Sequence, residues 1–194
     1  MARYASDHKE ATRRRIIETA GRRLKRDGID GAGITALMAD AGLTNGAFYA
    51  HFVSKDDLIA AVVRDQLGAQ ASTIAQLPEG REALTAYVGW YLSPEHRQDV
   101  ANGCPSAALL DEIARQGGEV SAAYQLGVAV IVDEVAHRLT RDWSLDPALA
   151  RTRALGLMTV LISSMQLARA MTDEQAAGQV LSAGLENAGA LLSS

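Results

Sequence analysis

Cysteine, proline and aromatic residues are scarce in this sequence, and each scarcity excludes a class of structure. The single cysteine, Cys104, cannot form an intrachain disulfide or a cysteine-based zinc site within one chain. Only 4 residues of 194 are proline and 5% are aromatic, while alanine and leucine are abundant. This composition favours helix almost everywhere, so we predict an all-α fold.

Long hydrophobic runs are also absent. No stretch approaches the roughly 18 uninterrupted apolar residues that a membrane span needs. The N-terminus lacks the charged and then apolar pattern of a secretory signal. We therefore expect a cytoplasmic protein with no membrane partner.

The charge of the chain is unevenly distributed. The net charge is −4, but residues 1–26 contain nine Lys or Arg and three Asp or Glu. This segment carries +6 and the remainder carries −10. The N-terminal part is therefore the segment that attracts a polyanion such as DNA. A solvated helix face is the alternative interpretation of the same charges.

Residues 11–67 contain the ingredients of a helix-turn-helix module, which is two helices joined by a tight glycine turn. Apolar spacing, caps and glycines predict helices over Thr12–Arg26, Ile34–Ala41, Asn45 to about His51, and from Ser54 onward. Gly42 lies in the turn, and Ser54 with Asp57 forms a capping pair. The segment 1–10 is expected to be a flexible arm.

The second helix of such a module inserts its N-terminal end into the major groove of DNA. Asn45 can hydrogen-bond a base edge, and Gly46 with Ala47 allows close approach. Thr44 is expected to cap this helix, and Tyr49, His51 and Lys55 are expected at the DNA phosphates. Arg13 and Arg14 could reach the adjacent backbone or the minor groove. At helical spacing, Phe48, Tyr49 and Phe52 also fit a core, and a lone His51 also fits a structural role.

The run from Gly42 to Leu58, GLTNGAFYAHFVSKDDL, resembles the signature of TetR-family repressors. The resemblance implies phosphate contacts by Thr44, Tyr49, His51 and Lys55. It further implies that Asn45, Gly46 and Phe48 lie at or near the bases and that Phe52 packs inside. Two positions depart from the family pattern, since Ile34 replaces a frequent capping Thr or Ser and Ala47 replaces a frequent glycine.

Residues 68–194 are predicted to form further helices, with long apolar segments over Val120–Arg141 and Ala148–Met171. The resemblance implies that they form a helical effector-binding and dimerisation domain. Candidate effector residues are Tyr87, Trp90, Tyr91, Cys104, Tyr124, Trp143, Met158 and Met165, each of which also fits a core. A dimer interface through the last two helices would use Leu155, Met158, Ile162, Met165, Val180, Leu181 and Gly184.

Cys104 precedes Pro105 at a predicted helix start, where the helix dipole stabilises a thiolate. The surrounding Gly-Cys-Pro segment resembles an element of one TetR subgroup, some of whose members respond to electrophiles or oxidants. A small buried hydrophobe is the alternative for this cysteine.

The sequence contains no complete motif for binding a cofactor or a metal ion. Gly31-x-Gly33-x-x-Ala36 matches a dinucleotide fingerprint, but a basic helix rather than a strand precedes it. His96 with Cys104 matches no catalytic template, and Asp133 with His137 fits an ordinary helix pair better than a metal site. We therefore expect no metal and no cofactor.

These observations predict a homodimeric repressor that binds a near-palindromic operator. A small-molecule effector or a thiol modification is expected to release it. The alternative is a small helical enzyme or a ligand-binding protein that uses the C-terminal domain.

Overall fold

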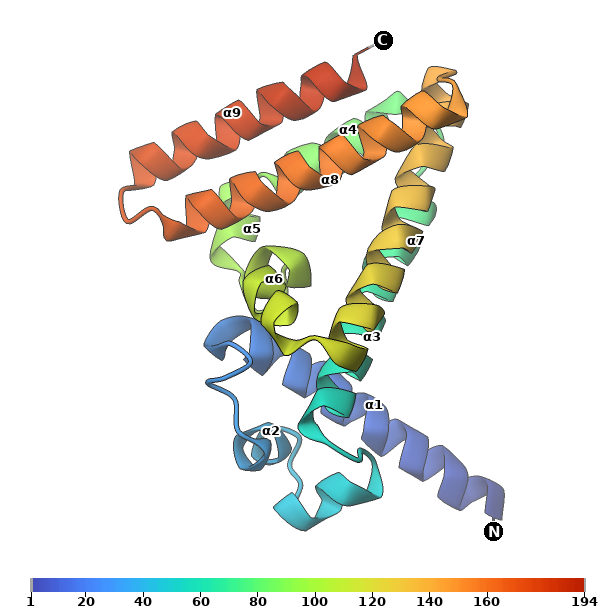
Figure 1. Cartoon of the computed structure of the whole chain (residues 1–194), viewed down its shortest axis with the longest axis vertical. Helices are drawn as coiled ribbons and strands as arrows, with labels where there is room; N and C mark the ends of the chain where they lie inside the picture. Colours follow the sequence, from blue (N-terminus) through green and yellow to red (C-terminus); the bar gives the residue numbers. More distant parts are fainter. Residues whose placement is uncertain (1, 194) are drawn as a thin grey trace.

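The computed structural model describes residues 2–193, with side chains from Asp7 onward, and contains helices and loops without strands in that range (Figure 1). The elements are α1 (Ala2–Asp27), α2 (Ile34–Asp40), the 3₁₀ helix η1 (Asn45–Ala50), α3 (Lys55–Ala75), α4 (Arg81–Tyr91), α5 (Pro94–Gln98), α6 (Pro105–Gln116), α7 (Gly118–Trp143), α8 (Pro147–Ala170) and α9 (Glu174–Leu192). The predicted all-α fold is confirmed. Between residues 2 and 193, no helix combines the length and hydropathy that a membrane span requires.

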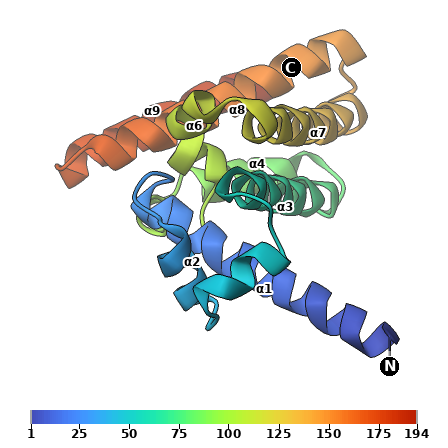
Figure 2. The ribbon, with the colours of Figure 1, turned by 60° about the horizontal axis from the view of Figure 1, so that its bottom comes forward.

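The N-terminal domain consists of α1, α2, η1 and the first turns of α3, which lie together at one end of the molecule (Figures 1 and 2). Ile16, Leu24, Leu37, Phe48 and Leu58 are fully buried in its core. The helix that we expected to begin at Thr12 begins at Ala2 and includes most of the expected arm. No glycine or proline separates Ala2 from Thr12, so nothing in the sequence interrupts the helix there.

The helix α3 connects the two halves of the chain. It starts at Lys55 beside η1 and continues to Ala75, with α7 packed along it in both views (Figures 1 and 2). The expected domain boundary between residues 67 and 68 therefore falls inside this helix. A lone glycine such as Gly68 costs a helix only about 1 kcal/mol relative to alanine, which is too little to end it.

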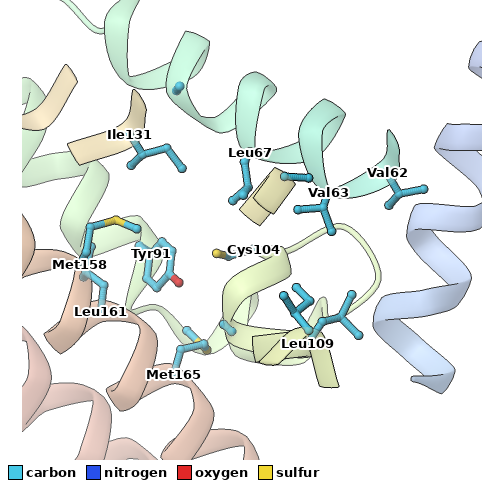
Figure 3. Packing of buried hydrophobic residues seen from close by; sticks show 14 of the residues in the cluster. Val62, Val63, Leu67, Tyr91, Cys104, Leu109, Ile131, Met158, Leu161 and Met165 are labelled. Atoms are coloured by element: carbon cyan, nitrogen blue, oxygen red, sulfur yellow. The ribbon is translucent and has the colours of Figure 1, made fainter. Parts of the chain in front are cut away.

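The C-terminal domain packs α3, α4 and α6–α9 around an apolar core. Figure 3 shows Met158 and Leu161 of α8 beside Tyr91 of α4, with Ile131 of α7 nearby. The long segments predicted from apolar patterning correspond to α7 and α8, and α7 is packed between α3 and α8 as expected. The helices α8 and α9 lie side by side at the end of the molecule opposite η1 (Figure 1).

Arg138 of α7 holds the C-terminal end of α3 in place. Its guanidinium is buried and donates to the carbonyl oxygens of Ile74, at 3.2 Å, and Leu77, at 3.0 Å, and also to that of Pro78. The Ile74 carbonyl oxygen also accepts from the Leu77 N–H at 3.2 Å. All three carbonyls lie at the end of α3 or just beyond it, where a helix leaves its last carbonyl oxygens without a partner one turn further on. Arg138 therefore fixes the position of α3 relative to α7.

Candidate DNA interface and ligand cavity

The segment predicted to enter the major groove is the 3₁₀ helix η1, not the α-helix that we expected. Thr44, Asn45 and Gly46 are exposed at its N-terminal end, and the Tyr49 side chain is 70% exposed. Ala47 is half-buried. Thr44 precedes the first residue as expected, but its hydroxyl makes no capping hydrogen bond. These side chains are free to contact another molecule.

Phe48 is completely buried, which agrees with the core alternative, and its side chain is not exposed for a direct contact with a base. Its ring makes an edge contact with Tyr49 at 5.2 Å and packs against Phe52 at 5.8 Å between centroids. Phe52 is buried as the resemblance implied. Both rings attach η1 to the core of the domain and thereby direct Tyr49 outward.

Arg13 and Arg14 lie on α1. The Arg13 guanidinium stacks over the Phe52 ring at 4.7 Å from its centroid, and Arg14 is exposed. His51 is half-buried, and burial together with Lys9 and Arg13 holds its pKa below the ordinary value. A neutral His51 can still offer an N–H to a phosphate oxygen.

Lys55 occupies the start of α3, but its ammonium group is engaged by the protein. The Nζ atom donates to the carbonyl oxygen of Ile29 at 2.5 Å. The N-terminal cap of α3 is as predicted, because the Ser54 hydroxyl accepts from the Asp57 N–H at 3.0 Å. Lys55 thus fixes the loop between α1 and α2, and a phosphate contact requires one of its other N–H groups.

The loop between α1 and α2 is also held by α6. The Glu112 carboxylate accepts from the Ile29 N–H at 2.6 Å and from the Asp30 N–H at 3.3 Å. No spacing signal in the sequence indicates this contact of Glu112 with a loop 83 residues away. A second connection joins the domains, because Lys25 of α1 donates to the Gly103 carbonyl oxygen at 2.8 Å.

A cavity of about 330 Å³ lies where α1, α3 and α4 meet the loop before α6. Four of the predicted effector residues line it, namely Tyr87, Trp90, Tyr91 and Cys104. Met158 lies instead at a void of about 10 Å³, which is too small for a ligand. Tyr124, Trp143 and Met165 line neither space, and their apolar contacts belong to the packed core.

Cys104 is the residue immediately before α6, as predicted, and is buried at the wall of the cavity. Its N–H donates to His96 Nε2 at 3.2 Å, and its thiol contacts Gln70 Oε1 at 3.5 Å. His96 Nδ1 lies 2.6 Å from the Tyr91 carbonyl oxygen, which only accepts, so Nδ1 carries the proton and Nε2 accepts. His96 is therefore neutral, in agreement with the lowering of its pKa by burial.

Lys25 also lines the cavity, although it was not among the predicted effector residues. Its side chain is only 7% exposed, and burial lowers its pKa to about 8. A signal was present in the sequence, since Ile17, Gly21 and Lys25 follow one another at intervals of four on a buried helix face. Such spacing places the lysine in the interior.

Other predicted contacts are not formed. Asp133 forms an ion pair with Arg151 of α8 rather than with His137. Met158, Met165, Leu181 and Gly184 are buried inside this chain, so they cannot form a surface for a second copy. The described residues contain no group of three or more His, Cys, Asp or Glu side chains placed to hold a metal ion.

The exposed face of η1 on a cationic N-terminal domain, beside a separate helical domain, defines a helix-turn-helix DNA-binding protein. The model of the family described as "Bacterial regulatory proteins, tetR family" matches residues 16–62. This match covers the helix-turn-helix part of the chain, and it supports a DNA-binding regulator rather than an enzyme. A comparison with the curated proteins found no match.

Solved structures of similar fold cover nearly the whole chain. The reduced form of NemR from E. coli has a TM-score of 0.76 at 18% identity, over 90% of this chain and 95% of that one. A TetR-family regulator from Agrobacterium tumefaciens has a TM-score of 0.71 at 22% identity, over 92% of this chain and 97% of that one. FadR from Bacillus subtilis, in complex with stearoyl-CoA, has a TM-score of 0.61 at 16% identity, over 89% of this chain and 97% of that one.

Proposed function

We propose that this protein is a homodimeric transcriptional repressor that binds a near-palindromic operator and is released by an effector. The observation that carries the proposal is the set of exposed polar side chains on η1, at the end of a domain whose first helix is rich in arginine. As a DNA-binding regulator it acts in the cytoplasm.

In the proposed complex, η1 enters the major groove and α1 lies against the DNA backbone. Asn45 contacts a base edge, while Thr44 and Tyr49 contact phosphates. Arg14 is exposed on α1 and makes no ion pair with a described carboxylate, so it is available for a phosphate. Arg23 is not available, because it holds Asp40 through two hydrogen bonds of 2.5 and 2.9 Å.

The outer faces of α8 and α9 are the proposed dimer interface. Leu155, Leu167 and Leu185 are exposed there, among small residues that permit close approach. Exposed apolar side chains on adjacent helices favour burial against a second copy. A twofold dimer presents two η1 segments, which matches two half-sites one helical turn apart.

The proposed switch uses α3 and α6, which connect the domains. An effector that changes how these helices meet α1 would change the separation of the two η1 segments. The effector must bind the form that cannot bind DNA more tightly than the form that can, because only differential affinity shifts the equilibrium.

Thiol modification at Cys104 is a second proposed route to release. The cysteine lines the cavity, so a reagent that enters the cavity reaches its sulfur. Among the structures of similar fold, NemR is described in a reduced form and FadR is bound to stearoyl-CoA, which supports redox or small-molecule control of this fold. A thiol-directed alkylator should release DNA from the wild type and spare Cys104→Ser. Equal release from both proteins would refute this route.

Competition binding tests the proposed function. The full chain is titrated into labelled DNA from the region upstream of its own gene, with scrambled competitor. The proposal predicts selective binding by two chains per site. Asp111→Asn serves as a matched surface control, because this exposed side chain lies on α6, away from η1. Equal affinity for scrambled DNA would argue against an operator in that region.

A further inference from the structure

The cavity between the two domains has the size and shape of a small-molecule site. Its volume of about 330 Å³ is within the usual range for ligand pockets. The walls come from α1 of the DNA-binding domain and from α3 and α4 of the C-terminal domain. A molecule bound there would touch both domains at once.

One wall of the cavity is aromatic. Trp90 stacks on His96 with ring centroids 4.9 Å apart and planes at 17°, yet its side chain remains 55% exposed. The Tyr87 ring lies 5.7 Å from that of Trp90. A large exposed indole at the wall of a cavity offers a flat surface to a planar ligand.

The interior of the cavity holds a buried positive charge. Lys25 donates to the Gly103 carbonyl oxygen, but it forms no ion pair with any carboxylate in the described part of the chain. Two acidic side chains, Glu18 and Asp65, also line the cavity, but both are exposed and therefore screened by water. A buried charge interacts more strongly than exposed ones, so the interior favours an anion.

A residue of the same cavity carries a hydrogen-bond donor without a partner. The Tyr91 side chain is buried, lines the cavity and has a hydroxyl with no hydrogen-bond partner among the described residues. Figure 3 shows this hydroxyl directed toward Cys104. Burial raises the pKa of Tyr91 well above its ordinary value, so the hydroxyl keeps its proton and can donate to an anionic oxygen.

We propose that this cavity binds a small planar aromatic carboxylate. Its ring stacks on Trp90 beside Tyr87, and its carboxylate accepts hydrogen bonds from Lys25 and the Tyr91 hydroxyl. The inference rests on the proposed function and deepens it, because it gives the effector a chemical class and a site. Binding would connect Lys25 of α1 to Trp90 of α4 through the ligand, which gives the effector a direct contact with each domain.

Calorimetric titration of the full chain near pH 7 with 2-naphthoate tests the proposal, and 2-naphthamide is the uncharged control of the same shape. We expect one naphthoate per chain, bound at least about tenfold more tightly than the amide, because only the acid pairs with the buried ammonium. Lys25→Met should weaken naphthoate binding by a factor of about ten or more and leave amide binding nearly unchanged.

Two further variants complete the test. Arg15→Met removes an exposed positive charge from α1 outside the cavity, so it should leave naphthoate binding unchanged. Trp90→Ala should weaken both the acid and the amide by a similar factor. Because Trp90 is largely exposed, this variant should fold even if Lys25→Met does not, which circular dichroism would check.

Equal affinity for acid and amide, unchanged binding in Lys25→Met, or no naphthoate binding up to about 1 mM would overturn the proposal. Since this titration contains no DNA, its outcome is separate from that of the operator assay. Operator binding without naphthoate binding would refute the aromatic carboxylate alone. Naphthoate binding without operator binding would refute the repressor and leave the ligand site intact.

Discussion

The proposed DNA complex places some exposed side chains of η1 at the bases and others at the phosphates, and the two groups predict different mutant phenotypes. Tyr49→Phe removes one exposed hydroxyl and keeps the ring that packs on Phe48. We expect a loss of about two- to tenfold in affinity for operator and scrambled DNA alike, because phosphate contacts carry no sequence information. Asn45→Ala should instead reduce discrimination between them by about 1–3 kcal/mol.

Fluorescence anisotropy with both DNAs measures the two effects in one experiment. The account would be contradicted if Tyr49→Phe changed sequence preference or if Asn45→Ala weakened all DNA equally. Arg151→Ala, on α8 at the other end of the molecule, is a control that should behave as the wild type.

Lys25 predicts a pH dependence of stability. Its pKa falls from 10.5 to about 8 on folding because of burial. The unfolded chain therefore binds the Lys25 proton more tightly, and stability should rise as pH increases from about 8 toward 10.5. Cys104, Asp99, Arg169 and Arg22 act on Lys25, so the comparison is made in a Cys104→Ser background, which removes the thiol.

Thermal melts of the Cys104→Ser protein, with Lys25 and with Lys25→Met, give the difference in Tm at each pH. We expect the protein with Lys25 to gain Tm relative to the variant between about pH 7 and pH 10. A Tm difference that does not change with pH, or a fall in the Tm of the Lys25 protein relative to the variant, would contradict a lowered pKa of Lys25.

The sequence predicted the exposed residues of η1, but it left Phe48 open between the core and the bases and gave no sign that Lys55 is engaged by the protein. Periodicity indicates which face of a helix is apolar, and a 3₁₀ helix turns its residues differently from the α-helix assumed. The partner of Lys55 is a carbonyl oxygen 26 residues away. A tertiary contact of this kind leaves no local pattern.

At the scale of elements, α6 is tied to the DNA-binding domain by Glu112. Replacing it by alanine removes the acceptor for the N–H of Ile29, a residue that is almost completely buried. An unsatisfied buried N–H costs about 1–3 kcal/mol, so we expect the free energy of unfolding of Glu112→Ala to fall by that amount. Glu112→Gln keeps an acceptor oxygen, so its free energy of unfolding should fall by less.

Urea unfolding of these variants checks the expectation, with Asp111→Ala as the control on an exposed neighbour. An equal effect of Glu112→Ala and Asp111→Ala on the free energy of unfolding would mean that the Glu112 hydrogen bonds contribute nothing to stability. A normal free energy of unfolding together with a lost effector response would instead assign Glu112 to signal transmission alone.

Most helices were predictable because their local signals are strong. Ser54 with Asp57, Pro105 and Pro147 all stand at helix starts in the structure. The early start of α1 and the continuation of α3 past Gly68 were missed. In both cases the chain lacked a strong breaker, and the packing of α3 along α7 outweighs the small cost of one glycine.

At the scale of the whole molecule, the proposed dimer depends on the outer faces of α8 and α9. Leu155→Glu and Leu185→Glu each place a charge on an exposed position in that surface. We expect either variant to remain folded and to become monomeric, because burying an unpaired carboxylate is unfavourable. Light scattering after size-exclusion chromatography gives the mass directly.

Leu126→Glu is the control, because Leu126 is also an exposed leucine but lies on α7, outside the proposed interface. A dimer that survives both substitutions on α8 and α9 but dissociates with Leu126→Glu would move the interface to α7. The residues predicted for this interface from the sequence include Met158, Met165, Leu181 and Gly184, which the chain buries within itself.

The central claim is that the N-terminal domain binds DNA by sequence, and salt-dependent anisotropy tests it most directly. The full chain is titrated into labelled upstream DNA and scrambled DNA at several salt concentrations. The account predicts tighter binding to one sequence, by two chains, with affinity falling steeply as salt increases because the arginines of α1 displace counterions. Absence of binding to either DNA at low salt would contradict it.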